Sequence, residues 1–257
     1  MTPPTLLHHH LLARLLGPPV ACLAVHRCAD GWRRRQFPNP TSRHEPLSPP
    51  LVLLRLAHNV LMSTYSVFAF AVCVQELWKR HSTLGVKDAL CRTPCATTVP
   101  LWEMSKYWEL ADLWFLALAN KSPRKLITFH HMSAGMLTAA NLVLRKQPTP
   151  LFHYAVLANS FVHIGVYAHF ARPMPHLRRV ITAAQACQHL FVVALLVTTL
   201  LLDECADQPT HAYAFSLSIY VVYAIAFARL YVELHGKRVR RNVPLPTWPL
   251  CHKAKVG

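Results

Sequence analysis

The chain has 257 residues, of which 53% are apolar and only 15% charged, and its mean hydropathy is +0.24. This composition carries too little charge for an ordinary soluble protein and predicts a polytopic membrane protein. The net charge of +16 does not indicate nucleic-acid binding, because Lys and Arg form short clusters between apolar segments, where membrane proteins carry them.

Residues 1–50 form the first predicted region. Residues 11–25 are apolar but interrupted by Arg14 and by Pro18-Pro19, so they form either a weak first transmembrane span or a tail that does not span. A cleaved signal peptide does not fit, because no basic segment precedes this stretch and no clear small-residue cleavage site follows it. Residues 32–50 are basic and rich in proline, which predicts an exposed connector.

Residues 51–236 form the second region, a predicted bundle of transmembrane helices, and residues 237–257 form a basic tail. Each apolar segment of the bundle is close to the roughly 20 residues that a bilayer requires. We expect spans at 51–78, 100–119, 126–144, 150–170, 180–202 and 212–234, with a polar loop at 82–98. The predicted fold class is therefore all-α, with six clear transmembrane helices and one weak one.

The distribution of basic residues predicts the orientation of the bundle. Lys and Arg concentrate in alternate connectors, and the positive-inside rule places these in the cytosol together with the C-terminus. The basic connectors are 27–43, 121–125, 172–179 and the tail from 237.

The eight cysteines show no CxxC and no zinc-finger spacing, so no zinc site is predicted. The acidic loop at 203–210 falls on the side opposite the basic connectors, as do Cys91 and Cys95. In the lumen of the endoplasmic reticulum, one of these two could form a disulfide with Cys205. We favour the pairing of Cys91 with Cys205.

Four of the expected helices carry polar side chains along one face. Polar groups in a bilayer must be satisfied within the protein, so these faces are expected to turn toward a shared polar chamber. Two adjacent histidines lie about 100° apart on a helix, so only one of them can point straight at the chamber. The residues are Lys106, Glu109 and Asp112; His130 and His131; Asn159, His163 and Tyr167; and Thr182, Gln185 and Gln188.

The sequence limits the chemistry of such a chamber. It has no Ser-His-Asp arrangement, no phosphate-binding glycine loop, and too few histidine motifs for a di-iron centre. A histidine acting as nucleophile or general base remains, with lysine, asparagine and glutamine to stabilise an oxyanion. No metal is expected.

Four motifs occur in order along the chain, at 106–115 (KYWELADLWF), 129–131 (FHH), 159–167 (NSFVHIGVY) and 182–188 (TAAQACQ). The series resembles the fatty acid elongase (ELO) family, whose motifs are KxxExxDTxF, HxxHH, NSxVHxxMY and TxxQxxQ. The resemblance covers about residues 51–235. It implies a seven-helix protein of the endoplasmic reticulum membrane that condenses malonyl-CoA with a long-chain acyl-CoA, giving 3-oxoacyl-CoA, CO2 and free CoA, without a cofactor.

The resemblance also implies roles for individual residues. His130 matches the nucleophile that accepts the acyl group, His131 matches the last histidine of that motif, and His163 would assist proton transfer or hold the substrate. Asn159 and Gln185 would orient the thioester or its enolate. The other expected substrate-binding residues are Lys106, Glu109, Asp112, Tyr167 and Gln188, and on charge and side alone Lys121, Arg124, Lys125, Arg178 and Arg179 are expected to bind CoA phosphates.

The partners that the resemblance implies are acyl-CoA, malonyl-CoA, membrane lipid and the other enzymes of the elongation cycle, which are a ketoacyl reductase, a dehydratase and an enoyl reductase. Self-association into a homo-oligomer stays open. Lys253 and Lys255 in the tail resemble a KxKxx signal for retrieval to the endoplasmic reticulum, which requires a cytosolic C-terminus.

The chain departs from the family motifs at several positions. Ile127 stands where HxxHH has its first histidine, Leu113 replaces the threonine of DTxF, and Val166 replaces the methionine before the tyrosine. Ile127 can neither hydrogen-bond nor titrate. A second hypothesis is therefore a catalytically impaired, elongase-like lipid-binding or accessory subunit. A third, a transporter, would need inverted repeats of broken helices, and the sequence shows none.

Overall fold

The computed structural model describes residues 4–36, 48–91, 98–121, 125–145, 150–202 and 210–236. These residues are helical apart from short turns, which confirms the all-α fold class. The helices are α1 (Pro4–Gln36), α2 (Pro49–Cys91), α3 (Thr98–Trp108), α4 (Ala111–Leu118), α5 (Lys125–Arg145), α6 (Pro150–Ala171), α7 (Arg178–Leu201) and α8 (Thr210–His235).

Four helices of the described part are long and apolar enough to cross a membrane. In each, half or more of the most apolar segment lies at least partly exposed on the outside of the bundle. An exposed apolar surface of this extent is stable against lipid and not against water. The chain is therefore a polytopic membrane bundle, with spans at Pro49–Val86, Leu151–Ala171, Arg178–Leu201 and Tyr213–His235.

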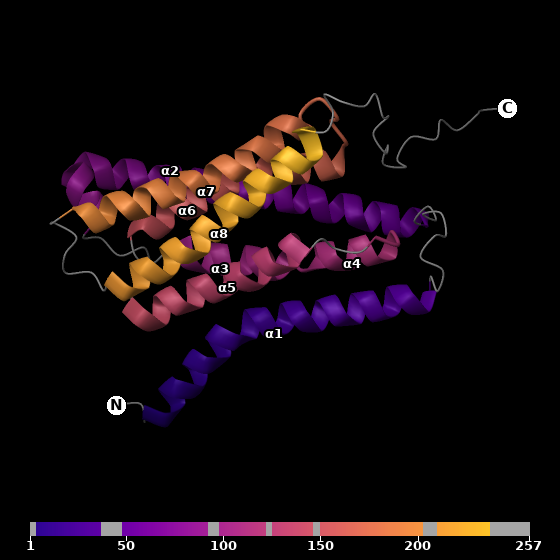
Figure 1. Cartoon of the computed structure of the whole chain (residues 1–257), viewed down its shortest axis with the longest axis horizontal. Helices are drawn as coiled ribbons and strands as arrows, with labels where there is room; N and C mark the ends of the chain where they lie inside the picture. Colours follow the sequence, from indigo (N-terminus) through magenta and orange to yellow (C-terminus); the bar gives the residue numbers. More distant parts are fainter. Residues whose placement is uncertain are drawn as a thin grey trace.

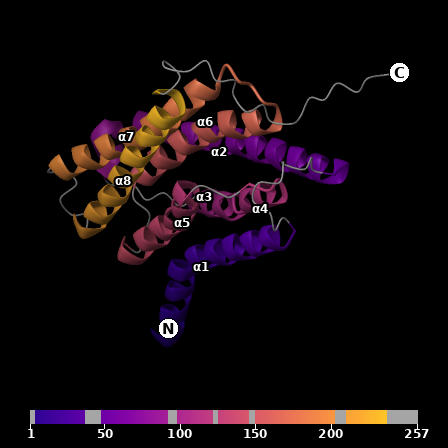
Figure 2. The ribbon, with the colours of Figure 1, turned by 45° about the vertical axis from the view of Figure 1, so that its right-hand side comes forward.

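Six of the helices form a closed ring. Going around it, α2 packs on α6, α6 on α7, α7 on α8, α8 on α5, α5 on α3, and α3 again on α2. Helix α3 also contacts α6 across the ring. Helix α1 lies outside, along α4 and α5 (Figures 1 and 2). The order around the ring differs from the order along the chain, so segments far apart in sequence share one interior.

The polar loop expected at 82–98 is wrong for its first part, because α2 continues to Cys91. The helix changes direction at Gly85, which has φ 75° and ψ 170°. Only glycine adopts such a positive φ without steric strain. No other atom lies within 4 Å of the place that a Cβ would occupy. Backbone conformation, and not crowding, therefore requires glycine at this kink.

The segment expected as one span at 100–119 is helical but divided into α3 and α4. The break is a tight turn whose hydrogen bonds run from residue i to i−3. They join Leu110 N to Tyr107 O at 3.2 Å, Asp112 N to Glu109 O at 3.1 Å, and Leu113 N to Leu110 O at 3.2 Å.

The exposed connector expected from residue 32 begins later, because α1 continues to Gln36. Asp30 binds the next turn of this helix, through Arg33 at 2.9 Å and Arg34 at 2.8 Å. Arg33 also donates to Asn120 Oδ1 at 3.5 Å, and its side chain is only 16% exposed. The Arg33 guanidinium therefore contacts Asn120, which follows α4, instead of being fully solvated. Pro18 and Pro19 lie within α1, which bends in its first half (Figure 1).

Candidate active site

A buried ion pair lies inside the ring at the end of α3. Lys106 Nζ lies 2.7 Å from Glu109 Oε1, and the Glu109 side chain is 0% exposed. Lys106 also donates to Asn159 Oδ1 at 3.2 Å. Glu109 contacts Nδ1 of His131 from α5 and Nδ1 of His163 from α6, both at 3.4 Å. We call these five residues the Glu109 cluster. It brings three of the four predicted polar faces together.

The α3–α4 segment runs parallel to α6, and successive polar residues of one pair with successive polar residues of the other. Four residues of an α-helix advance about 6 Å, at about 1.5 Å each. The tight turn between Glu109 and Asp112 advances about 2 Å per residue, so its three residues also cover about 6 Å. The break between α3 and α4 thus matches the three-residue step from Glu109 to Asp112 to the four-residue step from His163 to Tyr167. The pairs are Lys106 with Asn159, Glu109 with His163, and Asp112 with Tyr167.

Asp112 forms a second polar group one turn beyond the Glu109 cluster. The hydroxyl of Tyr167 donates to Asp112 Oδ2 at 2.8 Å, and His58 Nε2 lies 3.1 Å from Oδ1. The His58 ring packs against Phe115, with 5.2 Å between ring centroids. Both carboxylate oxygens are therefore occupied by protein groups, which indicates that Asp112 holds α2, α4 and α6 together.

The two adjacent histidines of α5 face different surroundings. His131 points to Glu109, whereas His130 packs among aromatic rings of α7 and α8. Its ring centroid lies 4.8 Å from that of Tyr223 and 5.7 Å from that of His189. The prediction that only one of the pair can face the centre holds for the Glu109 cluster. That residue is His131, and His130 faces a pocket instead.

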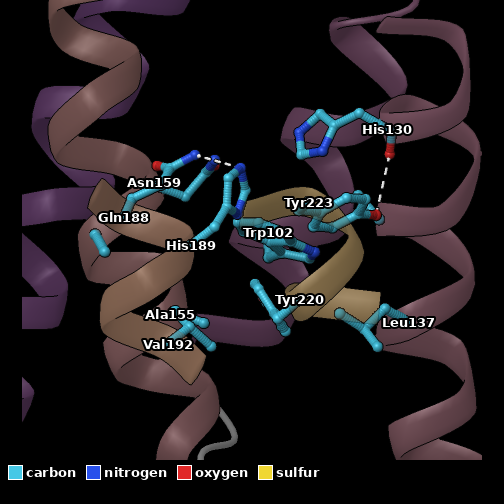
Figure 3. Close-up of a pocket in the computed structure, with 12 residues that line it drawn as sticks. Trp102, His130, Leu137, Ala155, Asn159, Gln188, His189, Val192, Tyr220 and Tyr223 are labelled. Atoms are coloured by element: carbon cyan, nitrogen blue, oxygen red, sulfur yellow. Dashed lines mark hydrogen bonds between the residues drawn. The ribbon is translucent and has the colours of Figure 1, made fainter. Parts of the chain in front are cut away.

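This pocket, which we call the His130 pocket, has about 320 Å³ of space between protein atoms, a volume that includes open solvent. Figure 3 shows His130 on one side and His189 with Gln188 on the other. Within the described part of the chain, Nδ1 of His130, Nδ1 of His189 and Oε1 of Gln188 have no hydrogen-bond partner. The pocket therefore offers unused polar atoms on an otherwise apolar wall. Its polar and aromatic lining residues are Trp102, His130, Asn159, Gln188, His189, Tyr220 and Tyr223.

A second pocket, the His163 pocket, lies between α2, α3 and α6 and has about 250 Å³ of space between protein atoms, open solvent included. Trp102 and Asn159 line both pockets and so form the wall between them. Lys106 stabilises this wall from within, because it donates to Asn159 and lies 4.1 Å from the centroid of the Trp102 ring. The hydroxyls that line the second pocket belong to Tyr65, Ser66, Ser105 and Ser160.

The predicted polar face of α7 reaches the pocket only at its end. Gln188 lines the His130 pocket, and its amide nitrogen lies 3.2 Å from His189 Nε2. Thr182 is buried but donates to the carbonyl of Arg178 on its own helix, at 2.8 Å. Gln185 is half-buried and lines neither pocket. Of this face, the structure thus places only Gln188 beside the other candidates.

The predicted CoA-binding residues lie at or near the end of the bundle where α4 ends and α5 and α7 begin. Lys121 is half-buried, and burial together with the positive charge of Arg55 lowers the pKa of its ammonium group. Lys125 is exposed, as is Arg179, which donates to the hydroxyl of Tyr231 at 2.9 Å. Arg178 is half-buried. Arg124 lies outside the described residues.

Cys91 is buried and disulfide-bonded. Cys205, the partner that we favour, lies outside the described residues, so its pairing stays a prediction. The tail with Lys253 and Lys255 also lies outside them.

Several residues of these sites were missed by the sequence predictions. His58 is a polar residue within an apolar span, a signal that could have identified it. His189 directly follows Gln188 but falls off the three-residue repeat, and Tyr220 and Tyr223 look like ordinary aromatic residues of a span. Trp102 carried no signal.

The arrangement suits chemistry at a carbonyl group. An imidazole with an unpaired ring nitrogen borders a pocket together with amide and imidazole donors, which are the groups needed by a nucleophile and by a developing oxyanion. No group of three or more His, Cys, Asp or Glu that could hold a metal ion occurs among the described residues.

Comparisons with known proteins identify a matching family and several relatives. Residues 35–243 match the family described as ELO: GNS1/SUR4 family. The chain is 30% identical over 156 residues to fatty acid elongase 2 of Trypanosoma cruzi, covering 55% of this chain and 54% of that protein. It therefore spans about half the length of that relative. It is 27% identical to fatty acid elongase sre1 of Dictyostelium discoideum, with 74% of this chain and 75% of the relative covered. Fatty acid elongase 2 of Trypanosoma brucei brucei is also 27% identical, with 72% and 75% covered.

Proposed function

Because the chain belongs to the ELO: GNS1/SUR4 family, we propose that it is an enzyme of fatty acid elongation. The reaction proposed is the condensation of malonyl-CoA with a long-chain acyl-CoA, which yields 3-oxoacyl-CoA, CO2 and free CoA. The three relatives are all named fatty acid elongases, which supports elongation as the process.

The observation that carries the proposal is the position of His130. Its side chain is buried, it borders the His130 pocket, and its Nδ1 has no partner among the described residues. An unpaired imidazole nitrogen on the wall of a pocket is available to a ligand or substrate, whereas an unpaired one that lines no pocket is not. We therefore assign His130 as the nucleophile.

The first proposed step is acyl transfer to the enzyme. A ring nitrogen of His130 attacks the thioester carbonyl carbon, and the tetrahedral intermediate expels the CoA thiolate. The thiolate takes up the proton that the acylated imidazolium loses from its other nitrogen, so the products are acyl-imidazole and free CoA.

The second proposed step is condensation. Malonyl-CoA loses CO2, and the resulting enolate carbon attacks the acyl-imidazole carbonyl, which releases 3-oxoacyl-CoA and the His130 imidazolate. The imidazolate takes up one proton from water and returns to neutral imidazole. Asn159 is well placed to orient the enolate, because it lines both pockets and Lys106 fixes its amide oxygen. His163 borders the second pocket and would handle a proton there.

His131 has a supporting role in this scheme. It lines neither pocket and contacts Glu109 at 3.4 Å. Glu109 in turn binds Lys106, which positions Asn159. A change at His131 therefore acts through the orientation of the other groups and not through contact with substrate.

The setting of the reaction is also proposed. We place the protein in the endoplasmic reticulum membrane with a cytosolic C-terminus, so that the basic end with Lys121 and Arg55 faces cytosolic acyl-CoA and malonyl-CoA. The like charges of these two residues influence each other, which favours binding of CoA phosphates between or beside them. The other enzymes of the elongation cycle would take the 3-oxoacyl-CoA onward, and self-association stays open.

One observation supports a second candidate function. Ile127, half-buried on α5, provides no ring nitrogen where the family motif has a histidine. If that histidine is required, the chain is an elongase-like lipid-binding or accessory subunit that keeps the fold without the chemistry.

The test is condensation by the purified protein in lipid, with radiolabelled malonyl-CoA and acyl-CoAs of several chain lengths. We expect product from the wild type, none from His130→Ala, and wild-type rates from His176→Ala, which removes an exposed histidine between α6 and α7. A silent wild type that becomes active in Ile127→His would favour the second candidate. Silence from all variants in folded protein would refute the proposed enzyme.

A further inference from the structure

The imidazole of His189 is held in an unusual way for a buried side chain. It is 3% exposed, and it belongs to α7, across the His130 pocket from α5 (Figure 3). Its Nε2 lies 3.2 Å from the amide nitrogen of Gln188. Because an amide nitrogen can only donate, Nε2 must accept, and the ring proton therefore resides on Nδ1.

This Nδ1–H group has no acceptor within the described part of the chain. Leaving a buried donor unpaired is costly, and most such groups in native proteins have a partner or a function. The neighbouring rings of Tyr223 and Phe227 pack against His189, at 5.1 and 4.8 Å between centroids, and fix its position. The donor is thus fixed in orientation and has nothing to bind.

The two imidazoles form one corner of the His130 pocket. Their ring centroids are 5.7 Å apart at 69°, an edge-to-face contact, and both residues line the pocket. A carbonyl group that enters the pocket and lies against His130 would therefore have the His189 ring beside it. A productive site needs such a place near both the nucleophile and an oxyanion donor.

We propose that His189 is a catalytic residue whose Nδ1–H stabilises the oxyanion formed when His130 attacks a thioester carbonyl, with Gln188 fixing the tautomer. This inference rests on the proposed function. His189 donates a hydrogen bond to the carbonyl oxygen as its charge develops and transfers no proton. When the intermediate collapses, the carbonyl re-forms, the CoA thiolate leaves with the proton lost by His130, and His189 is unchanged.

His189 also supplies an imidazole near His130 that Ile127 does not. Residues 127 and 130 are one turn apart on the same face of α5. A histidine at 127 would have placed a second imidazole next to His130 from the same helix. In this chain a second imidazole reaches His130 from α7 instead, so the pocket contains an imidazole pair despite Ile127.

The test separates the first half-reaction from binding. Wild-type and variant proteins in lipid are mixed with radiolabelled acyl-CoA, and the rate constant of CoA release, the amount of acyl-enzyme and KM are measured. His189→Phe keeps the ring packing and removes the donor, so we expect kcat of acyl transfer to fall about 100-fold, as for loss of one oxyanion donor, with KM little changed. His189→Asn places an N–H near the position of Nδ1 and should recover at least a tenth of the wild-type rate.

Two controls make the outcome decisive. His153→Phe is the matched variant, because His153 is 0% exposed in α6, has no hydrogen-bond partner among the described residues and lines neither pocket. It should leave acyl transfer within about twofold of wild type. Equal rates for wild type and His189→Phe would overturn the inference alone, as would a loss in Tyr220→Phe without one in His189→Phe. A wild type that forms no acyl-enzyme would overturn the proposed function, and this inference with it.

Discussion

The Glu109 cluster and the His130 pocket lie side by side in the ring, share Asn159, and differ in how their polar groups are paired. In the cluster Lys106 and Glu109 form an ion pair at 2.7 Å, and Glu109 Oε2 and His131 Nδ1, which form no hydrogen bond, still face each other at 3.4 Å. In the pocket, ring nitrogens and an amide oxygen have no partner among the described residues. Paired groups give rigidity, whereas unpaired ones are available to a substrate. The difference teaches that a polar interior can combine a scaffold and a reactive surface only a few side chains apart.

The largest effect is expected from breaking the ion pair of the cluster. Lys106→Met leaves the Glu109 carboxylate buried without its counter-charge and should lower the free energy of unfolding by about 3–5 kcal/mol. The double variant Lys106→Met/Glu109→Leu removes both charges and should recover most of this loss. Denaturation midpoints of both variants in detergent test this. A double variant no more stable than the single one would contradict the view that pairing is the function of the cluster.

A smaller effect is expected at the neighbouring Asp112 group. Tyr167→Phe removes a 2.8 Å hydrogen bond to a carboxylate, which should cost about 2 kcal/mol of stability. The matched control is Tyr154→Phe, which removes a 2.6 Å bond between a hydroxyl and a ring nitrogen of His81 and should cost about 1 kcal/mol. Unfolding measured by loss of helical circular dichroism compares the two. The reverse order would show that charge does not strengthen the Asp112 bond.

The smallest effect on stability is expected in the pocket. Tyr220 lines the His130 pocket, and Tyr220→Phe removes only its hydroxyl, so the free energy of unfolding should change by less than about 0.5 kcal/mol. The same unfolding experiment, run beside Tyr167→Phe, provides the measurement. A loss as large as that of Tyr167→Phe would mean that the pocket is stabilised like the cluster.

The spacing of polar residues explains which parts of the fold and the site could be predicted from the sequence. Lys106, Glu109, Asn159 and His163 fall on repeats of three and four within apolar segments, and such repeats define a helix face. Polar faces of helices in a bilayer must be satisfied within the protein. The convergence of these four residues therefore followed from the sequence. The length of the apolar segments likewise predicted the spans.

The remaining features depend on relations between helices, which no repeat contains. Whether His130 or His131 meets Glu109 is decided by the rotation of α5 against α3. His189 lies one position away from the polar face of α7 and reaches His130 only because α7 and α5 are linked around the ring through α8. The break after Trp108 accompanies the pairing of Asp112 with Tyr167 of α6, a relation that residues 100–119 do not contain alone.

The parallel pairing of α3–α4 with α6 has a consequence for synthesis of the chain. Lys106 and Glu109 are three residues apart and can pair as soon as their helix forms, whereas Asn159 lies 53 residues after Lys106. At about 5–20 residues per second, a ribosome needs about 3–10 s to deliver it. During that interval the nascent protein must carry a locally neutralised ion pair at the membrane without its permanent neighbours. The three-residue spacing thus lets the two charges neutralise each other before Asn159 is synthesised as well as in the folded bundle.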